Sequence, residues 1–190
     1  MGVIKLKSKL QFTKGISSVC LSRTSTDGLK DDGVSLFGWG STSLKKEDEG
    51  KPSKFLRGTY QLRVTSVGNC KRKISRLTYE ENSPNIAVFH RTSWLKTNTF
   101  DGEKSMEGLI CVEDIQPNGL IGSCKGDSGS PVTKLVNLPH GGRMYEQIGI
   151  VSGGRCSDSS APTVLTHIGH ERVLKFILNH SKFIMSSHLY

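Results

Sequence analysis

The stretch Gly122-Ser123-Cys124-Lys125-Gly126-Asp127-Ser128-Gly129-Ser130-Pro131 sets a serine between glycines and directly after a carboxylate. A serine hydroxyl is a poor nucleophile at neutral pH, so it needs a base beside it and N–H donors for the oxygen that becomes negative. Glycines around Ser128 let the backbone turn sharply and present bare N–H groups. The carboxylate of Asp127 requires a partner wherever it is buried. The stretch therefore predicts the nucleophile loop of a hydrolase.

Three further segments accompany this loop in a characteristic order. They are the turn Phe37-Gly38-Trp39-Gly40, the run Gly149-Ile150-Val151-Ser152-Gly153-Gly154-Arg155-Cys156, and Pro162-Thr163-Val164-Leu165-Thr166-His167-Ile168 with an amphipathic run behind it. Together with the loop they resemble the trypsin-like (chymotrypsin-fold) serine endopeptidases, which usually have glycine where this chain has Ser130. The alternative is a Gly/Ser-rich turn in an unrelated β protein, because a motif is a hypothesis that needs its context.

The resemblance implies an all-β fold: the second six-stranded antiparallel β-barrel of the trypsin-like fold with a C-terminal α-helix, the first barrel being largely missing. Residues 1–190 would form a partial peptidase domain. Residues 1–20 would be the segment that crosses from the first barrel, 34–170 the second barrel with a long insertion near 78–107, and 171–180 the terminal helix.

Local patterns predict the elements of this barrel. Alternating or continuous apolar runs predict strands at Val3–Lys7, Val34–Gly40, Tyr60–Val67, Leu109–Val112, Val132–Val136 and Tyr145–Val151. Apolar residues at helical spacing predict a helix over Glu171–Asn179. Inside the insertion, Ile86–Phe89 fits a short strand or an apolar flap, and a surface loop fits equally well.

The resemblance also implies roles for individual residues. Ser128 would be the nucleophile, the N–H groups of Gly126 and Ser128 the oxyanion hole, and Asp127 the carboxylate that pairs with an N-terminal amine released by cleavage. The substrate would contact Gly122, Ser123, Ser152, Gly153, Gly154 and Thr163. Gly122 stands where trypsins carry aspartate, so the primary pocket has no charge for Arg or Lys, and we expect it to take small or medium apolar side chains.

Two members of the catalytic triad have no match in this sequence. The family's histidine and aspartate would lie before Met1, and none of the six histidines occupies the family's position. The chain alone is therefore expected to be nearly inactive. It is either part of a serine endopeptidase or a non-catalytic serine protease homolog that acts in binding or regulation, and an incomplete gene model is a third interpretation.

The five cysteines favour disulfides, because no pair has the spacing of a zinc site or of Cys-x-x-Cys. They predict an oxidising, secreted setting and no metal or cofactor. The resemblance implies the pairs Cys70–Cys111 and Cys124–Cys156, with Val34 and Lys134 in place of the family's other core disulfide. Cys20 is left over, which suggests a disulfide-linked N-terminal segment.

The basic composition does not specify a nucleic-acid or membrane partner. The formal net charge is +9, but no aromatic residues interleave with the basic clusters, and no run is long enough to span a bilayer. A solvated basic surface explains the charge, with attraction to polyanions as the alternative. Met1–Leu10 lacks the apolar core of a signal peptide. Expected partners are protein or peptide substrates or inhibitors, and Asn179-His180-Ser181 is a glycosylation sequon or an unused tripeptide.

Overall fold

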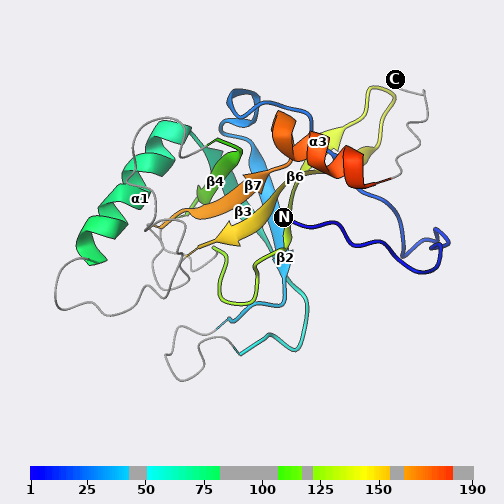
Figure 1. The fold of residues 1–190 in the computed structure, drawn as a ribbon, viewed down its shortest axis with the longest axis horizontal. Helices are drawn as coiled ribbons and strands as arrows, with labels where there is room; N and C mark the ends of the chain where they lie inside the picture. The colour runs from blue at the N-terminus through cyan, green and yellow to red at the C-terminus, as the bar shows by residue number, and fades with distance from the viewer. Residues whose placement is uncertain (43–50, 82–106, 117–121, 155–160, 182–190) are drawn as a thin grey trace.

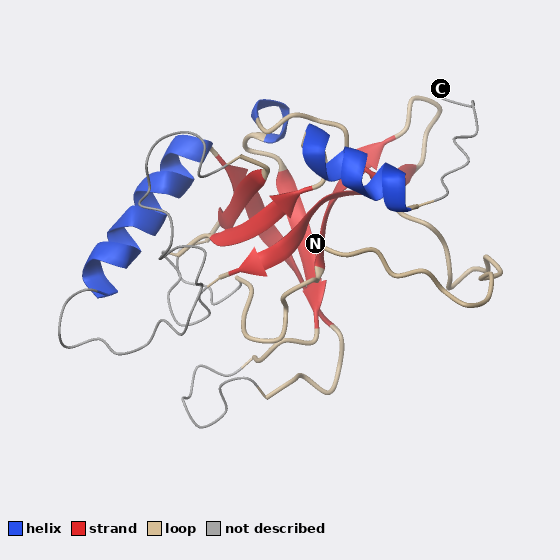
Figure 2. Ribbon diagram, viewed as in Figure 1, coloured by secondary structure: helices blue, strands red, loops and turns tan. Residues whose placement is uncertain are grey.

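The computed structural model describes residues 1–42, 51–81, 107–116, 122–154 and 161–181. It is a β structure flanked by two helices, α1 and α3, on opposite sides of the strands (Figures 1 and 2). In chain order the elements are β1 (Cys20–Leu21), the 3-10 helix η1 (Asp27–Leu29), β2 (Gly33–Gly38), β3 (Arg57–Thr65), α1 (Val67–Glu81), β4 (Leu109–Asp114), β5 (Pro131–Asn137), β6 (Arg143–Gly153), β7 (Thr163–His167) and α3 (Glu171–His180).

Six of these strands close into an antiparallel barrel. The neighbours run β6-β5-β2-β3-β4-β7, and β7 pairs back with β6, so the sheet has no open edge among these six. The short β1 lies parallel to β6, with Cys20 opposite Glu146. The predicted barrel and its C-terminal helix are confirmed.

Inward-facing side chains fill the barrel, and β2, β4 and β7 each also contain three consecutive buried residues. Val34 and Leu36 of β2 meet Leu62 and Val64 of β3, and each of these four is at most 5% exposed. The remaining members of this cluster are Leu29, Ile110, Val112, Val132, Ile148, Val151 and Leu165. The core therefore draws on every strand of the barrel.

The helix α1 was not predicted, and the strand expected to reach Val67 is wrong at its end. β3 stops at Thr65 and α1 begins at Val67. The helix packs on β4 through Cys70 and Ile74, which form a second buried cluster with Cys111 and Val164. The predicted disulfide Cys70–Cys111 is present within this cluster.

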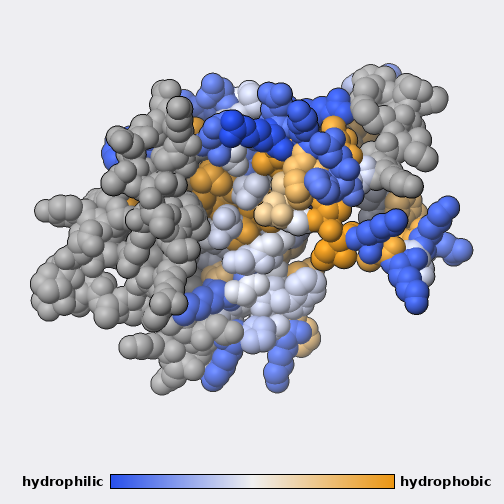
Figure 3. Space-filling view, in the orientation of Figure 1, coloured by the Kyte–Doolittle hydropathy of each residue, from blue (hydrophilic) through white to orange (hydrophobic). Residues whose placement is uncertain are grey.

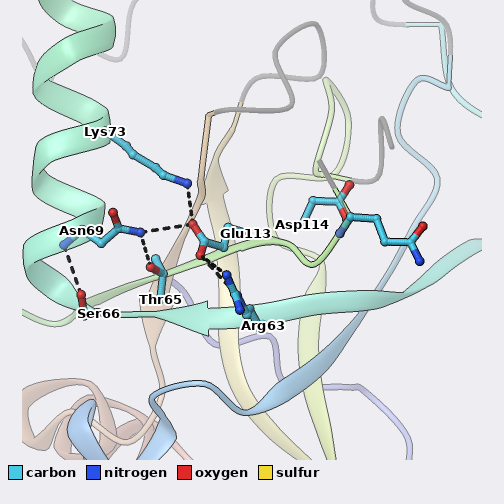
Figure 4. Close-up of polar contacts among 8 residues, drawn as sticks. Arg63, Thr65, Ser66, Asn69, Lys73, Glu113 and Asp114 are labelled. Atoms are coloured by element: carbon cyan, nitrogen blue, oxygen red, sulfur yellow. Dashed lines mark hydrogen bonds and ion pairs between the residues drawn. The ribbon is translucent and has the colours of Figure 1, made fainter. Parts of the chain in front are cut away.

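A polar network also holds α1 to the barrel (Figure 4). Glu113 of β4 accepts hydrogen bonds from Lys73 Nζ at 2.6 Å and from Asn69 Nδ2 at 3.3 Å. Arg63 of β3 pairs with the same carboxylate at 3.3 Å. Because the side chain of Glu113 is only 12% exposed, these donors replace the water that it loses on folding.

His167 joins the end of β7 to the segment that precedes β2. The ring is 2% exposed, with Nε2 at 3.0 Å from the carbonyl oxygen of Thr24 and Nδ1 at 3.4 Å from Thr26 Oγ1. A carbonyl only accepts, so Nε2 carries the proton in this tautomer. Burial lowers the pKa of His167 below 6.5, and neighbouring His170 lowers it further, against the opposing effect of the bond to Thr24.

Residues 1–19 form an exposed arm outside the barrel. The strand expected at Val3–Lys7 is wrong: these residues pair with no strand in the described structure, and Ile4 is 89% exposed. In the space-filling view, hydrophobic atoms gather near the centre of the face shown, among hydrophilic ones (Figure 3). The alternating pattern is real, but the described structure offers it no neighbouring strand, and a strand needs one to satisfy its backbone groups.

Candidate active site

Ser128 lies within the second of two consecutive tight turns, residues 124–127 and 127–130. The N–H of Asp127 donates to the carbonyl of Cys124 at 3.0 Å, and that of Ser130 donates to the carbonyl of Asp127 at 2.9 Å. The third residue of each turn is a glycine with positive φ, +99° at Gly126 and +90° at Gly129. A side chain at these positions would strain the backbone, which explains the spacing of the glycines. Ser128 is exposed at the surface of the second turn.

The N–H groups expected to form an oxyanion hole are available for a ligand. Within the described residues, neither Gly126 nor Ser128 donates its backbone N–H to a protein acceptor. An oxyanion hole requires such donors to be held in place before the reaction, so that stabilising the charge costs no reorganisation. The turn bonds provide that rigidity on both sides of Ser128.

Asp127 points into the protein beneath this loop. It is 6% exposed, and its two carboxylate oxygens accept separate backbone hydrogen bonds: Oδ1 from Gly40 N–H at 2.8 Å and Oδ2 from Cys124 N–H at 2.9 Å. Hydrogen bonds to an ionised acceptor are stronger than neutral ones. The carboxylate therefore ties its own loop to the turn at residues 37–40, 87 residues away in the sequence.

These contacts explain why residues 38 and 40 are glycines. A Cβ on Gly40 would lie 2.4 Å from the carboxyl carbon of Asp127, and a Cβ on Gly38 would lie 2.1 Å from Oδ1. The roles of the Gly40 and Cys124 N–H groups as anchors for Asp127 were not predicted. The Gly38-Trp39-Gly40 motif could have indicated the contact with Gly40, because paired glycines suggest that other atoms approach the backbone closely.

The serine loop is attached to the strand expected to bind the substrate backbone. Gly129 donates its N–H to the carbonyl of Val151, and Val151 donates back to the carbonyl of Ser130, both at 2.9 Å. The exposed Ser152 follows directly at the end of β6, and Gly153 and Gly154 come next. The structure thus brings Ser128 and residues 152–154 to one region of the barrel.

The residues expected to line the primary pocket also come together. Ser123 donates its N–H to Thr163 Oγ1 at 3.1 Å, the two hydroxyls lie 3.1 Å apart, and both residues are at most 2% exposed. Gly122 is close to the same threonine, since a Cβ there would lie 3.4 Å from Oγ1. Gly154 packs directly on this pair: a Cβ there would lie 2.2 Å from Ser123 Oγ. The space beside Gly154 is therefore occupied by Ser123 in this structure.

A hollow of about 380 Å³ opens beside Asp127. Its lining includes Gly38, Gly40, Arg57, Thr59, Gly122 and Asp127. The only carboxylate in this lining is that of Asp127, so the hollow combines one buried negative charge with the positive charge of Arg57 at its wall.

The described histidines lie elsewhere. His167 is held by Thr24 and Thr26, His170 lies 3.8 Å from a carboxylate oxygen of Glu107, and His180 contacts the carbonyl of Phe176. His140 is exposed in the turn between β5 and β6. Within the described residues, Ser128 Oγ makes no hydrogen bond, and His90 and His188 fall outside them.

The structure also describes some of the predicted cysteines and tests for metal ligands and membrane helices. Cys20 is a free, exposed cysteine, and Cys124 is disulfide-bonded, while Cys156 lies outside the described residues. No group of three or more His, Cys, Asp or Glu side chains is arranged to hold a metal in the described part of the chain. Among the same residues, no helix is both long and apolar enough to cross a bilayer.

Comparisons with known proteins agree with this geometry. A family model described as Trypsin matches residues 1–177. Testisin of Homo sapiens is 25% identical over 171 residues, covering 90% of this chain and 44% of testisin. Transmembrane protease serine 11G of Rattus norvegicus is 24% identical over 175 residues, covering 90% of this chain and 33% of that protein. The chain thus spans less than half the length of these relatives, and it belongs to the trypsin-like serine protease family.

Proposed function

We propose that this chain is the serine-bearing part of a secreted serine endopeptidase, which cleaves peptide bonds by acyl transfer to Ser128. The hydroxyl would attack the scissile carbonyl, and the N–H groups of Gly126 and Ser128 would stabilise the resulting oxyanion. The histidine base and its aspartate would come from a part of the protein that is not in this sequence. Neither is needed to build the loop, which is held by the bonds of its own turns and of Asp127.

One observation carries the proposal: the exposed Ser128 stands on a rigid double turn with two undonated N–H groups beside it. A loop that served only to connect strands would not need two left-handed glycines and a buried carboxylate. Burying an ion costs several kcal/mol before its hydrogen bonds are counted, so a buried Asp127 carboxylate is not expected in a loop that only connects two strands.

The substrate class follows from the hydroxyl pair of Ser123 and Thr163. These groups are uncharged, and Gly122 adds no charge, so nothing there would compensate a buried Arg or Lys side chain of the substrate. We propose protein or peptide substrates with a small or medium apolar residue before the cleaved bond. In this structure Ser123 fills the space beside Gly154, so the pocket would have to widen when a substrate binds.

The second candidate is a non-catalytic homolog that binds a partner or inhibitor through the same cleft. The placement of the described histidines favours it, because each is engaged or exposed at a distance from the serine loop. A serine without a base retains its shape and its N–H donors but not its reactivity. Under this candidate the loop recognises a peptide backbone and does not cleave it.

The test uses the protein isolated from its natural source, analysed with and without reduction, and a fluorophosphonate probe. The endopeptidase proposal expects a stoichiometric adduct that is lost in Ser128→Ala and retained in Ser130→Ala. It also expects a second polypeptide released from Cys20 on reduction, if the missing residues are held there. A native protein with the mass of this chain alone and no adduct would reject catalysis and leave the binding homolog.

A further inference from the structure

One tripeptide with the pattern Asn-X-Ser/Thr, X not being proline, occurs in the whole sequence, at Asn179-His180-Ser181. It lies outside the residues used by the serine loop and the barrel core. Because the sequence has a single such site, any asparagine-linked glycan on this chain can be assigned without ambiguity.

The structure places Asn179 on the solvent side of α3. Residues at positions i, i+3 and i+7 share one helix face, and here those are Arg172, Lys175 and Asn179. All three are exposed, and the side chain of Arg172 is 80% exposed. The residues facing the barrel are the half-buried Val173, Leu174, Phe176 and Ile177. A bulky group on Asn179 would therefore displace none of the packing of the helix.

The site also lies where the helix ends. α3 stops at His180, and Ser181 has an extended backbone, with φ at −120° and ψ at 130°. The hydroxyl of Ser181 donates to the carbonyl of Ile177. Since the serine of the motif is engaged in this way after folding, attachment is expected before the last turn of the helix forms.

From this placement we infer that Asn179 is a site of N-linked glycosylation, an inference that rests on the secretory part of the proposed function. The carboxamide nitrogen of Asn179 would attack the anomeric carbon of an oligosaccharide carried on a lipid pyrophosphate. The new bond joins that nitrogen to the sugar carbon, and the bond from the same carbon to the pyrophosphate oxygen breaks. The lipid pyrophosphate leaves, one amide proton goes to a base, and no atom changes oxidation state.

The glycan has a local physical consequence. Leu178, next to the site, is 42% exposed, and the rings of Phe176 and His180 lie 4.3 Å apart on the same short helix. A glycan is bulky and strongly hydrated, so it would cover this partly apolar end of α3. We expect the glycosylated chain to be the more soluble form.

The experiment treats the natural protein with peptide N-glycosidase F and maps the peptide that contains residue 179 by mass spectrometry. The expected result is a fall in mass on treatment, with aspartate at position 179 afterwards. In secretory-pathway expression, Asn179→Gln and Ser181→Ala should both lose the modification, whereas Ser181→Thr should keep it. The Asn179→Gln variant keeps the Ser181 hydroxyl, so it separates loss of the motif from loss of the bond to Ile177, and the Thr variant is the control that keeps both.

Two outcomes overturn the inference and differ in what else they reject. Unmodified Asn179 in a natural protein whose Cys70–Cys111 bond is oxidised would reject glycosylation and leave the secretory setting intact. Unmodified Asn179 together with a reduced Cys70 and Cys111 would reject the secretory setting as well. Labelling of Ser128 by the fluorophosphonate probe is measured separately from the glycan at Asn179, so a loss of catalysis cannot be mistaken for a loss of glycosylation.

Discussion

Replacement of Asp127 by asparagine tests whether the buried carboxylate holds the serine loop. The two side chains have nearly the same shape, so the change removes charge without creating a cavity. Asparagine can still accept one hydrogen bond through its oxygen, but it presents an NH₂ group to the second backbone N–H. Either the Gly40 or the Cys124 N–H then loses its acceptor.

The expected cost follows from these two bonds. A hydrogen bond to a charged group contributes about 1.5–3 kcal/mol, and a neutral one about 0.5–1.5 kcal/mol. One charged bond is lost at 2.8–2.9 Å and the other becomes neutral, with a partial offset because no ion is buried in the variant. We expect Asp127→Asn to lower the free energy of unfolding by about 2–4 kcal/mol, a large part of the about 5–15 kcal/mol of an ordinary domain.

The assay is urea unfolding of the oxidised chain, followed by circular dichroism and tryptophan fluorescence. A matched control is Asp31→Asn: Asp31 is exposed and has φ of 66°, a conformation that asparagine tolerates, so its stability should change by less than about 0.5 kcal/mol. If Asp127→Asn behaves like this control, with an unchanged denaturant slope, the carboxylate does not anchor the loop and the reasoning is refuted.

Three further changes probe the barrel around the site. Glu113→Gln should lower the free energy of unfolding in urea by only about 1 kcal/mol, because the ion pair with Lys73 at 2.6 Å is partly screened by solvent. An unchanged free energy of unfolding would show that this ion pair does not stabilise the fold. As the pH falls from about 7.5 to about 5.5, the free energy of unfolding should decrease, because the lowered pKa of His167 means that the unfolded chain binds more protons than the folded one. His167→Gln should reduce this dependence of stability on pH. An unchanged dependence would contradict the lowered pKa of His167. The pair Val34→Cys and Lys134→Cys should form a disulfide that stabilises the oxidised variant over its reduced form by up to about 4 kcal/mol; failure to oxidise would contradict the strand register.

The register behind the last prediction shows what could be foreseen from the sequence. Ser35 pairs with Thr133 and Leu36 with Val132, so the same register sets Val34 beside Lys134 across β2 and β5. The resemblance had named those two positions as a lost disulfide. In its place the ammonium of Lys134 lies 3.1 Å from a carboxylate oxygen of Asp32 and 3.7 Å from one of Glu146, and these pairs now link the segments.

The missed helix and the missing strand have different causes. Val67, Cys70 and Ile74 recur at helical spacing and would have indicated α1, but the alternation of Tyr60–Val67 immediately before them reads as one continuous strand. At Val3–Lys7 the alternation is present and no strand forms, because periodicity describes which face can be buried and not whether a neighbour exists. Patterns therefore located the barrel strands, where neighbours are present, and failed at its margins.

The serine loop could be located from the sequence, but the contacts that hold it in place could not. The motif around Ser128 names the loop, yet nothing local to it explains why Asp127 can remain buried. The explanation lies in Gly38 and Gly40, whose missing side chains leave the volume that the carboxylate occupies. Either glycine would resist substitution even though neither belongs to the serine loop, because a side chain there would push Asp127 off the N–H groups that hold it. A turn far away in the sequence thus sets the position of Ser128, and the two motifs act as one structural unit in either proposed function.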